Sequence, residues 1–217
     1  MIEGNKKTKI AVCVPARDQM HTATSFALWY LCERLCKEGI ENRLFVSPGT
    51  LIANQRHELV RCAYEWDATH VLFIDSDIMF EPDHVLQLLD FNEEIVGAAY
   101  SKRVEPLIIT AWTKIDDWHT WIKPDEQEYS HIKVAAMGLG FCLIKMSVFD
   151  RIELPWFQLG FNQENQQYTG EDIEFFRKCG QKGIDIWLDV AVTLQLGHLG
   201  TKNFKAIDDD DLNISTY

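Results

Sequence analysis

The sequence lacks the features that mark membrane, secreted and cysteine-zinc proteins. No apolar run approaches the roughly 18–20 residues of a membrane-spanning helix. Residues 1–9 are polar and basic, without the apolar middle region of a secretory signal. No two cysteines form a CxxC pair, so a zinc site built from cysteine is not expected. We therefore expect a soluble, cytoplasmic protein of bacterial or viral type, with no membrane span and with its six cysteines as free thiols.

Positive charge is also scarce. The chain has 21 lysine and arginine residues against 33 aspartate and glutamate residues, a formal net charge of −12. Such a surface repels phosphate backbones, so no nucleic-acid partner is expected, although a local positive patch can still bind a nucleotide. Residues 208–211 are four consecutive aspartates, which we expect to form a solvated acidic tail over residues 206–217.

What the sequence does contain is a regular alternation of short apolar runs and helical periodicity in its first half. The 217 residues, 47% of them hydrophobic, suffice for one α/β domain with a sizeable core. Apolar runs predict strands at 9–15, 43–47, 70–74 and 95–100. Helical spacing predicts helices over 21–39 and 54–66 and from Pro82 onward. This order predicts a mostly parallel sheet with helices on its faces, which binds ligands at the carboxyl ends of its strands.

The second half is more irregular. We expect strands, some of them antiparallel, within 108–121 and at 132–136, 141–145, 186–188 and 192–196, with a helix over 170–183. The chain is therefore predicted to be a single domain. It would have a nucleotide-binding half over about 9–103 and an acceptor and metal half over about 104–205.

Asp75 and Asp77 follow directly after the apolar strand predicted at 70–74. Acidic residues in this position often cap or turn the chain. Here the next helix has its own start signal at Glu81-Pro82, so the pair is not needed as a cap. Divalent cations such as Mg²⁺ and Mn²⁺ prefer carboxylate oxygens, and a nucleoside diphosphate can supply further ligands. The spacing therefore suggests a metal site.

The context of this pair resembles the GT-A glycosyltransferases, of the DxD-containing, family-2-like type that uses nucleotide sugars. The matching segments, in chain order, are Val14-Pro15-Ala16-Arg17-Asp18, Asn54-Gln55-Arg56, Asp75-Ser76-Asp77, Gly138-Leu139-Gly140-Phe141, Gly170-Glu171-Asp172 and His198. They span nearly the whole chain. The resemblance implies a single GT-A type domain. Its Rossmann-like sheet would be mostly parallel, with helices on both faces and a smaller antiparallel portion in the C-terminal half.

The resemblance also implies roles for these residues. Asp77 and His198 would ligate Mn²⁺ or Mg²⁺, and Asp75 would lie near the ribose or reach the metal through water. The expected partners are a UDP- or GDP-sugar donor and a glycan or other hydroxyl acceptor. The residues expected to bind the donor are Pro15, Ala16, Arg17, Asp18, Asn54, Arg56, Asp75, Ser76, Gly140 and Lys202.

Asp172, with Glu171 beside it, is the expected catalytic pair. In the inverting enzymes that this segment resembles, the aspartate deprotonates the attacking hydroxyl, and general-base help of this kind contributes roughly 10²–10⁴-fold. The two acids also suit the positive end of a helix, which is a structural explanation for them. Retaining enzymes of the same fold can carry acids here, so inversion is the favoured interpretation and retention stays open.

Two other functions remain as alternatives. A sugar-1-phosphate nucleotidylyltransferase would open with a glycine-rich phosphate loop, and residues 15–22 contain no glycine. A noncatalytic sugar-nucleotide-binding module would have no need for Asp172.

Aromatic residues in the second half are candidates for an acceptor platform, although tryptophan is more often packed in a core. The candidates are Trp112, Trp118, Trp121, Trp156 and Phe157. The polar stretch 157–169 is a candidate loop that closes over the site.

Overall fold

The structure is a computed structural model that describes residues 7–103, 107–115, 122–123, 130–163 and 166–200, together with the backbone of 203–204. Lys202, the aspartates at 208–211, Trp118 and Trp121 lie outside the described residues. In the part of the chain that is described, no helix combines the length and the apolar character that a bilayer crossing requires.

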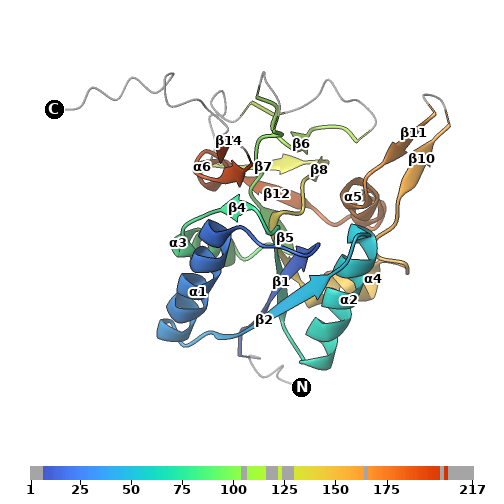
Figure 1. The fold of residues 1–217 in the computed structure, drawn as a ribbon. Helices are drawn as coiled ribbons and strands as arrows, with labels where there is room; N and C mark the ends of the chain where they lie inside the picture. Colours follow the sequence, from blue (N-terminus) through green and yellow to red (C-terminus); the bar gives the residue numbers. More distant parts are fainter. Residues whose placement is uncertain are drawn as a thin grey trace.

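A seven-stranded sheet in the order β2-β1-β3-β9-β5-β12-β7 forms the centre of the fold (Figure 1). Its strands are β1 (Lys9–Ala16), β2 (Glu41–Pro48), β3 (His70–Ile74), β5 (Ile95–Gly97), β7 (His131–Val134), β9 (Phe141–Lys145) and β12 (Ile186–Asp189). β1 is parallel to β2 and β3, and β12 is parallel to β5. β9 is antiparallel to both β3 and β5, and β7 is antiparallel to β12. Only β9 and β7 therefore oppose the common direction, which confirms the predicted sheet.

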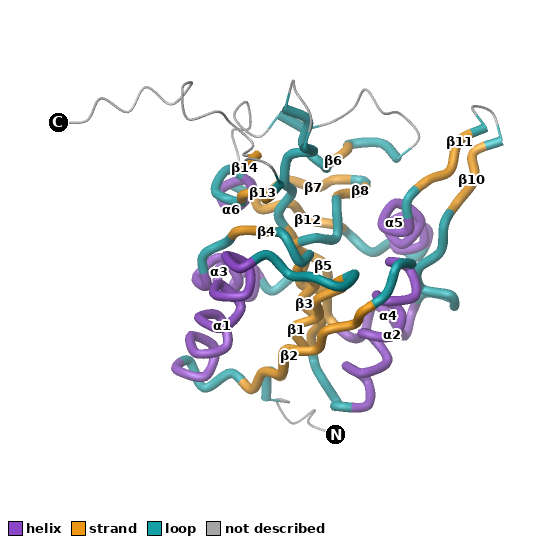
Figure 2. The backbone as a smooth tube through the Cα atoms, viewed as in Figure 1, coloured by secondary structure: helices purple, strands orange, loops and turns teal. Residues whose placement is uncertain are grey.

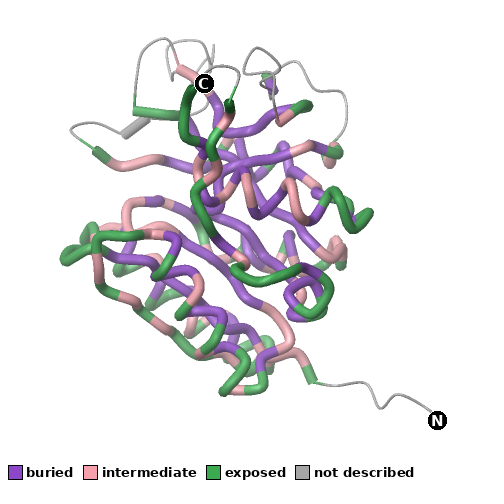
Figure 3. The backbone as a smooth tube through the Cα atoms, turned by 90° about the vertical axis from the view of Figure 1, so that its right-hand side faces the viewer, coloured by how far each residue is buried: buried purple, intermediate pink, exposed green. Residues whose placement is uncertain are grey.

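Helices cover both faces of this sheet (Figures 1 and 2). α1 (Thr22–Lys37) and α3 (Pro82–Phe91) lie on one face, and α2 (Ile52–Glu65), α4 (Met146–Arg151) and α5 (Glu171–Gln181) lie on the other. The sides of these helices that face the sheet are buried, while their outer sides are exposed (Figure 3). This arrangement confirms the helices predicted on both faces.

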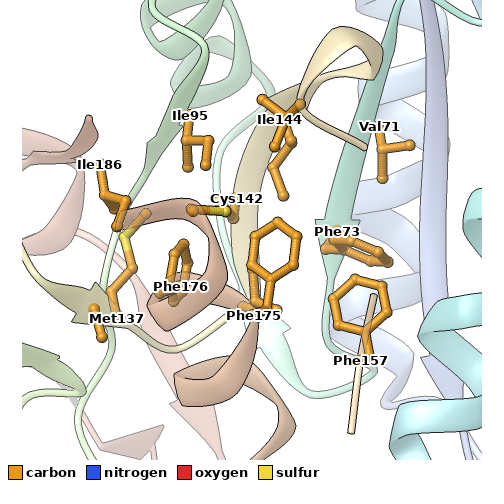
Figure 4. Close-up of a cluster of buried hydrophobic side chains, with 14 of the residues drawn as sticks. Val71, Phe73, Ile95, Met137, Cys142, Ile144, Phe157, Phe175, Phe176 and Ile186 are labelled. Carbon is orange, nitrogen blue, oxygen red and sulfur yellow. The ribbon is translucent and has the colours of Figure 1, made fainter. Parts of the chain in front are cut away.

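The alternation of side chains along β1 divides the core into two clusters. Val12 packs with the leucines of α1 on one face, and Cys13 packs with α2 on the other. The second cluster continues across β9 and α5, where Phe175 and Phe176 meet Cys142 and the neighbouring strands (Figure 4). Burial on both faces explains why β1 and β3 are apolar after their first residues, Lys9 and His70.

Three small sheets lie around the central one. β4 (Ile78–Met79) pairs with β13 (Gly197–Leu199), which pairs with β14 (Asn203–Phe204). β6 (Ala111–Trp112) pairs with β8 (Ala136–Met137). β10 (Gly160–Asn162) and β11 (Gln167–Thr169) form an antiparallel hairpin where a polar loop was predicted.

Two sequence predictions fail in detail. The strand expected at 192–196 is wrong, because α6 (Val190–Thr193) occupies this region. Asp189 accounts for the difference: its carboxylate accepts a hydrogen bond from the Val192 N–H at 2.9 Å, and its carbonyl accepts one from the Thr193 hydroxyl at 2.6 Å. This cap outweighs the β-branched composition of the segment. The strand expected over 95–100 ends at Gly97, and Tyr100 pairs with Thr110 instead.

Candidate functional site

Arg56 is the centre of a buried polar network at the carboxyl end of β3. Its side chain is only 2% exposed. One terminal nitrogen lies 3.0 Å from Asp75 Oδ1, the other donates to the Leu139 carbonyl at 3.0 Å, and Nε lies 3.1 Å from Glu171 Oε1. The planar fork of donors on a guanidinium suits this divided set of acceptors. Arg56 thereby joins the DxD segment, the glycine segment and the start of α5.

The position of Arg56 follows from the local sequence. Ala53, Arg56 and Val60 all lie on the buried side of α2, which packs against β1. Spacings of three and four residues place side chains on the same side of a helix. A charged residue on a buried side needs partners, and Arg56 has two hydrogen-bond acceptors and the nearby Glu171 carboxylate, all from other elements. The fold therefore brings Arg56 together with Asp75 and Glu171, and the Arg56 side chain has little access to solvent.

Tyr100 is the second connecting residue, and sequence reasoning missed it. Its hydroxyl donates to Asp75 Oδ2 at 3.1 Å, and its ring meets the His198 ring edge-on at a centroid distance of 4.8 Å. Burial, followed by the negative charge of Asp75, raises the pKa of Tyr100 far above its usual value, so the hydroxyl keeps its proton. One signal was available, because this tyrosine ends the apolar run of a predicted strand at the ligand-binding edge.

Gly140 is fixed by the close approach of these side chains. A Cβ atom at this position would lie 2.5 Å from Asp75 Oδ2 and 2.6 Å from the Tyr100 ring. The backbone also contributes, since the Asp75 N–H donates to the Gly140 carbonyl at 2.9 Å. The glycine that the motif carries is therefore required by packing in the protein itself.

Asp77 and His198 lie side by side although 120 residues of chain separate them. Strand β13 pairs with β4 in a register that sets His198 opposite Ile78, next to Asp77. His198 Nε2 is 3.5 Å from Asp77 Oδ1. Its Nδ1 is 2.8 Å from the Ser101 carbonyl, which can only accept, so Nδ1 carries a proton. Asp77 Oδ2 forms an ion pair with Arg103, another residue that sequence reasoning missed.

The pair Asp77 and His198 fits a divalent cation. With Nδ1 donating to a carbonyl, the other ring nitrogen of His198, Nε2, lies 3.5 Å from a carboxylate oxygen of Asp77. Two acceptors that face each other need a proton or a cation between them, and a second-shell bond at Nδ1 is typical of metal-ligating histidine. Among the described residues, no group of three His, Cys, Asp or Glu side chains forms a metal site.

Asp75 lies beside this pair but is engaged elsewhere. Its two carboxylate oxygens interact with Arg56 and Tyr100. For Asp77, burial favours the neutral acid, but the interactions with His198 and with the charge of Arg103 outweigh it and lower the pKa. Asp77 is therefore ionised at neutral pH and available to a cation.

Asp172 occupies the first turn of α5 on the other side of Arg56. Burial is the largest cause that raises its pKa to about 6, followed by the negative charge of Glu171. Arg56 and the Ile173 N–H, 2.8 Å from Oδ1, oppose this shift. One guanidinium faces three carboxylates, those of Asp75, Glu171 and Asp172. This excess of negative charge keeps the proton affinity of Asp172 high.

The first loop adjoins this network at the end of β1. Pro15 and Ala16 are buried within the strand, whereas Arg17 and Asp18 are exposed. The Arg17 carbonyl accepts a hydrogen bond from the Gly49 N–H at 3.0 Å. This bond ties the loop after β1 to the loop after β2.

A cavity of about 500 Å³ opens at the start of α2, beside that junction. Exposed Asn54 lines it together with residues 47–51 and His57.

Ser76, the middle residue of the DxD segment, stabilises the start of α1. Its carbonyl accepts a hydrogen bond from the His21 N–H at 2.9 Å. Of the expected donor-binding residues, Lys202 lies outside the described residues.

The described aromatic candidates for an acceptor platform are packed inside the protein. Trp112 and Phe157 are buried, and Trp156 is partly buried against His57 and Tyr64. The exposed aromatic residues near α5 are Phe161 and Tyr168, which lie on the β10–β11 hairpin with ring centroids 5.1 Å apart.

This sheet order, with helices on both faces and carboxylates at its ligand-binding edge, defines a GT-A-like, Rossmann-type α/β fold. No protein-family model and no curated protein matches the sequence. The crystal structure of A197 from STIV is similar over 93% of this chain and 95% of that chain, with a TM-score of 0.58 and 18% identity. A mutant Drosophila beta-1,4-galactosyltransferase 7 in complex with manganese, UDP-Gal and xylobiose covers 94% of this chain. That likeness extends over 72% of the galactosyltransferase chain, with a TM-score of 0.51 and 15% identity.

Proposed function

We propose that the protein is a glycosyltransferase that moves a sugar from a UDP- or GDP-sugar to a hydroxyl group of a glycan or another acceptor. The observation that carries this proposal is the arrangement of Asp77 and His198 at one edge of the sheet, linked through Asp75 and Arg56 to Asp172. The pair can hold a cation, and Asp172 can hold a proton at neutral pH or just below it. The similar galactosyltransferase structure, with its manganese and UDP-Gal, supports the same assignment.

Asp77 and His198 would hold Mn²⁺ or Mg²⁺. A divalent cation in this position supplies charge neutralisation for a departing diphosphate. Asp75 is held by Arg56 and Tyr100 and presents a fixed negative edge toward the ribose of the donor. The loop at 15–18 and Asn54 would bind the base and ribose beside the cavity at the start of α2. Lys202 stays a proposed phosphate contact.

Asp172 is the proposed general base of an inverting reaction. Glu171 is committed to Arg56, so it positions the helix start and leaves proton transfer to its neighbour. The Asp172 carboxylate accepts a hydrogen bond from the Ile173 N–H, and its remaining lone pairs can receive the proton of an acceptor hydroxyl. A pKa of about 6 is well matched to that task near neutral pH.

Incubation of the protein with a panel of nucleotide sugars and Mn²⁺ tests the function. We expect release of nucleoside diphosphate that stops on addition of chelator and in Asp77→Asn. Pyrophosphate exchange with a nucleoside triphosphate would instead identify a nucleotidylyltransferase. Binding of donors without turnover, for any acceptor offered, would identify a noncatalytic module.

The variant Asp172→Asn tests whether Asp172 acts in proton transfer and not in donor binding. We expect the variant to bind nucleotide diphosphate with wild-type affinity, while transfer falls by roughly 10²–10⁴-fold, because the amide cannot take a proton. Calorimetry and product release measure the two quantities on the same sample. The anomeric configuration of the product, read by NMR, should be opposite to that of the donor. Retained configuration, or normal transfer by Asp172→Asn, would contradict this role.

A further inference from the structure

One short segment of chain contacts both residues of the proposed cation site. The Ser101 carbonyl accepts from His198 Nδ1, and two residues later the Arg103 guanidinium pairs with Asp77 Oδ2. His198 lies toward the other oxygen of the same carboxylate, Oδ1. Arg103 therefore occupies the side of Asp77 that faces away from the histidine.

The two arginines of the site are held in very different ways. The Arg56 side chain is 2% exposed and has three partners from separate elements. The Arg103 side chain is 39% exposed, and its partner Asp77 is 31% exposed. Separating Arg56 from its partners would leave unpaired charges in the interior, which is strongly unfavourable. An ion pair that water can reach contributes little, so Arg103 can leave Asp77 readily.

We propose that Arg103 is an exchangeable counter-ion that holds Asp77 while no cation is bound and binds the donor diphosphate after a cation displaces it. This inference rests on the cation site of the proposed function. The Asp77 carboxylate cannot hold a guanidinium at Oδ2 and a divalent cation at Oδ1 at the same time with full strength, because the two positive groups repel each other across it. The released guanidinium then lies at a site where a diphosphate brings negative charge, and its fork of donors matches phosphate oxygens.

The exchange makes cation and nucleotide binding mutually dependent. A cation alone must displace Arg103 from Asp77 and gives it no new counter-charge. A diphosphate gives the displaced side chain a new partner, so each ligand strengthens the other, and the coupling is reciprocal. Arg103 is thus a donor-binding residue that the sequence motifs do not include.

Binding of Mn²⁺ alone, followed by electron paramagnetic resonance, tests the first step. We expect Arg103→Gln to bind Mn²⁺ about two- to fivefold more tightly than the wild type, which is the range that the loss of an exposed ion pair allows. Lys102→Gln is the matched control. It removes the same charge from the neighbouring exposed residue, whose ammonium lies 5.7 Å from the Trp112 ring centroid. This control should bind Mn²⁺ like the wild type.

Titration of UDP and GDP in the presence of saturating Mn²⁺ tests the second step. Arg103→Gln should bind the nucleotide more weakly than the wild type, and Arg103→Lys should recover part of the loss. The strengthening of Mn²⁺ binding by nucleotide should be smaller in Arg103→Gln than in Lys102→Gln.

The outcomes separate this inference from the function beneath it. If Arg103→Gln and Lys102→Gln bind Mn²⁺ equally well, and bind nucleotide equally well, the proposed role of Arg103 is wrong. If Asp77→Asn loses Mn²⁺ binding in the same experiment, the cation site of the proposed function is still supported. Failure of the wild type to bind Mn²⁺, with or without nucleotide, would remove the cation site and this inference with it.

Discussion

At the scale of single residues, Arg56 contributes to the stability of the fold, which its sequence motif alone does not indicate. It lies between Asp75 and Glu171, with almost no exposure to solvent. Removal of the guanidinium leaves the buried carboxylate of Glu171 and the partly buried one of Asp75 without their counter-charge. That situation is far less favourable than the loss of an ordinary surface ion pair. The residue is therefore as much a part of the stability of the fold as of the site.

We expect Arg56→Met to lower the free energy of unfolding by about 3–5 kcal/mol, the range for breaking a buried charge pair. Arg61→Met is the matched control on the same helix, because Arg61 is exposed and pairs only with Glu58 and Glu65 along the surface. The control should change the free energy of unfolding by less than about 1 kcal/mol. Urea unfolding followed by circular dichroism measures both. Similar effects of the two substitutions would contradict the assigned geometry.

The proton affinity of Asp172 predicts how transfer depends on pH. Its pKa is raised to about 6 by burial and by the charge of Glu171. A general base acts in its deprotonated form, so the rate of transfer should rise as pH increases through about 6 and reach a plateau above it. Initial rates at saturating donor and Mn²⁺ over about pH 5–8 measure the profile. A rate that is flat across this range would argue against Asp172 as the base.

At the scale of elements, two glycines that look equivalent in sequence have opposite requirements. Gly140 precedes β9 and lies against Asp75 and Tyr100, with no room for a Cβ atom. Gly180 lies within α5, and nothing is within 4 Å of the position that its Cβ would occupy. Glycine inside a helix is unfavourable relative to alanine.

Gly140→Ala should therefore displace Asp75 or Tyr100 and weaken nucleotide diphosphate binding by roughly tenfold or more, since an overpacked site loses about 1–3 kcal/mol. Gly180→Ala should leave binding unchanged and raise the free energy of unfolding by about 0.5–1 kcal/mol. Calorimetric titration with UDP or GDP and urea unfolding distinguish the two. Wild-type binding in Gly140→Ala would show that this close approach has no bearing on the donor site.

Much of the fold could be predicted because its signals are local. The apolar runs of β1 and β3 and the helix start at Glu81-Pro82 are visible in the sequence, and the structure confirms them. α6 was predicted as a strand because its composition is β-branched, and the decisive cap comes from a single side chain, Asp189. Local composition cannot reveal which of two nearby conformations one hydrogen bond selects.

The site was predictable to the extent that it follows motifs. Asp75, Asp77, Arg56 and Asp172 do lie together or adjacent, although their roles remain proposals. The position of Tyr100 at the end of an apolar run was visible in the sequence, but its contacts were not, because they depend on how the chain leaves β5 and returns through the pairing of Ser101 with Ile109. Side chains that act through tertiary contacts carry no spacing signal of their own.

At the scale of the whole molecule, the same carboxylate that is suited to catalysis weakens the fold. Because the folded-state pKa of Asp172 is raised from 3.8 to about 6, the folded protein binds this proton more tightly than the unfolded chain does. The resulting stabilisation is full below pH about 4 and is lost as pH rises through about 6. Above that pH, the ionised Asp172 carboxylate lowers the free energy of unfolding.

Asp172→Asn should consequently be more stable than the wild type at pH 7.5, by roughly 1–3 kcal/mol, and the advantage should shrink toward pH 4.5. The amide is similar in shape to the protonated acid and does not titrate. Urea unfolding at the two pH values measures the difference, and Asp150→Asn, at an exposed helical position, serves as the control. An advantage that is independent of pH would indicate a packing effect instead of an ionisation effect.

The pairing of β4 with β13 has a consequence for the order in which the protein is made. β9 enters the sheet between β3 and β5, and β13 delivers His198 to Asp77 near the end of the described chain. A ribosome releases the chain from its N-terminus, so Asp77 emerges long before its histidine partner. The nascent protein can complete most of its sheet while still unable to hold a cation in this arrangement. Under the proposed function, cation binding therefore requires a chain that extends through β13, and a product that stops before β13 would not use the donor.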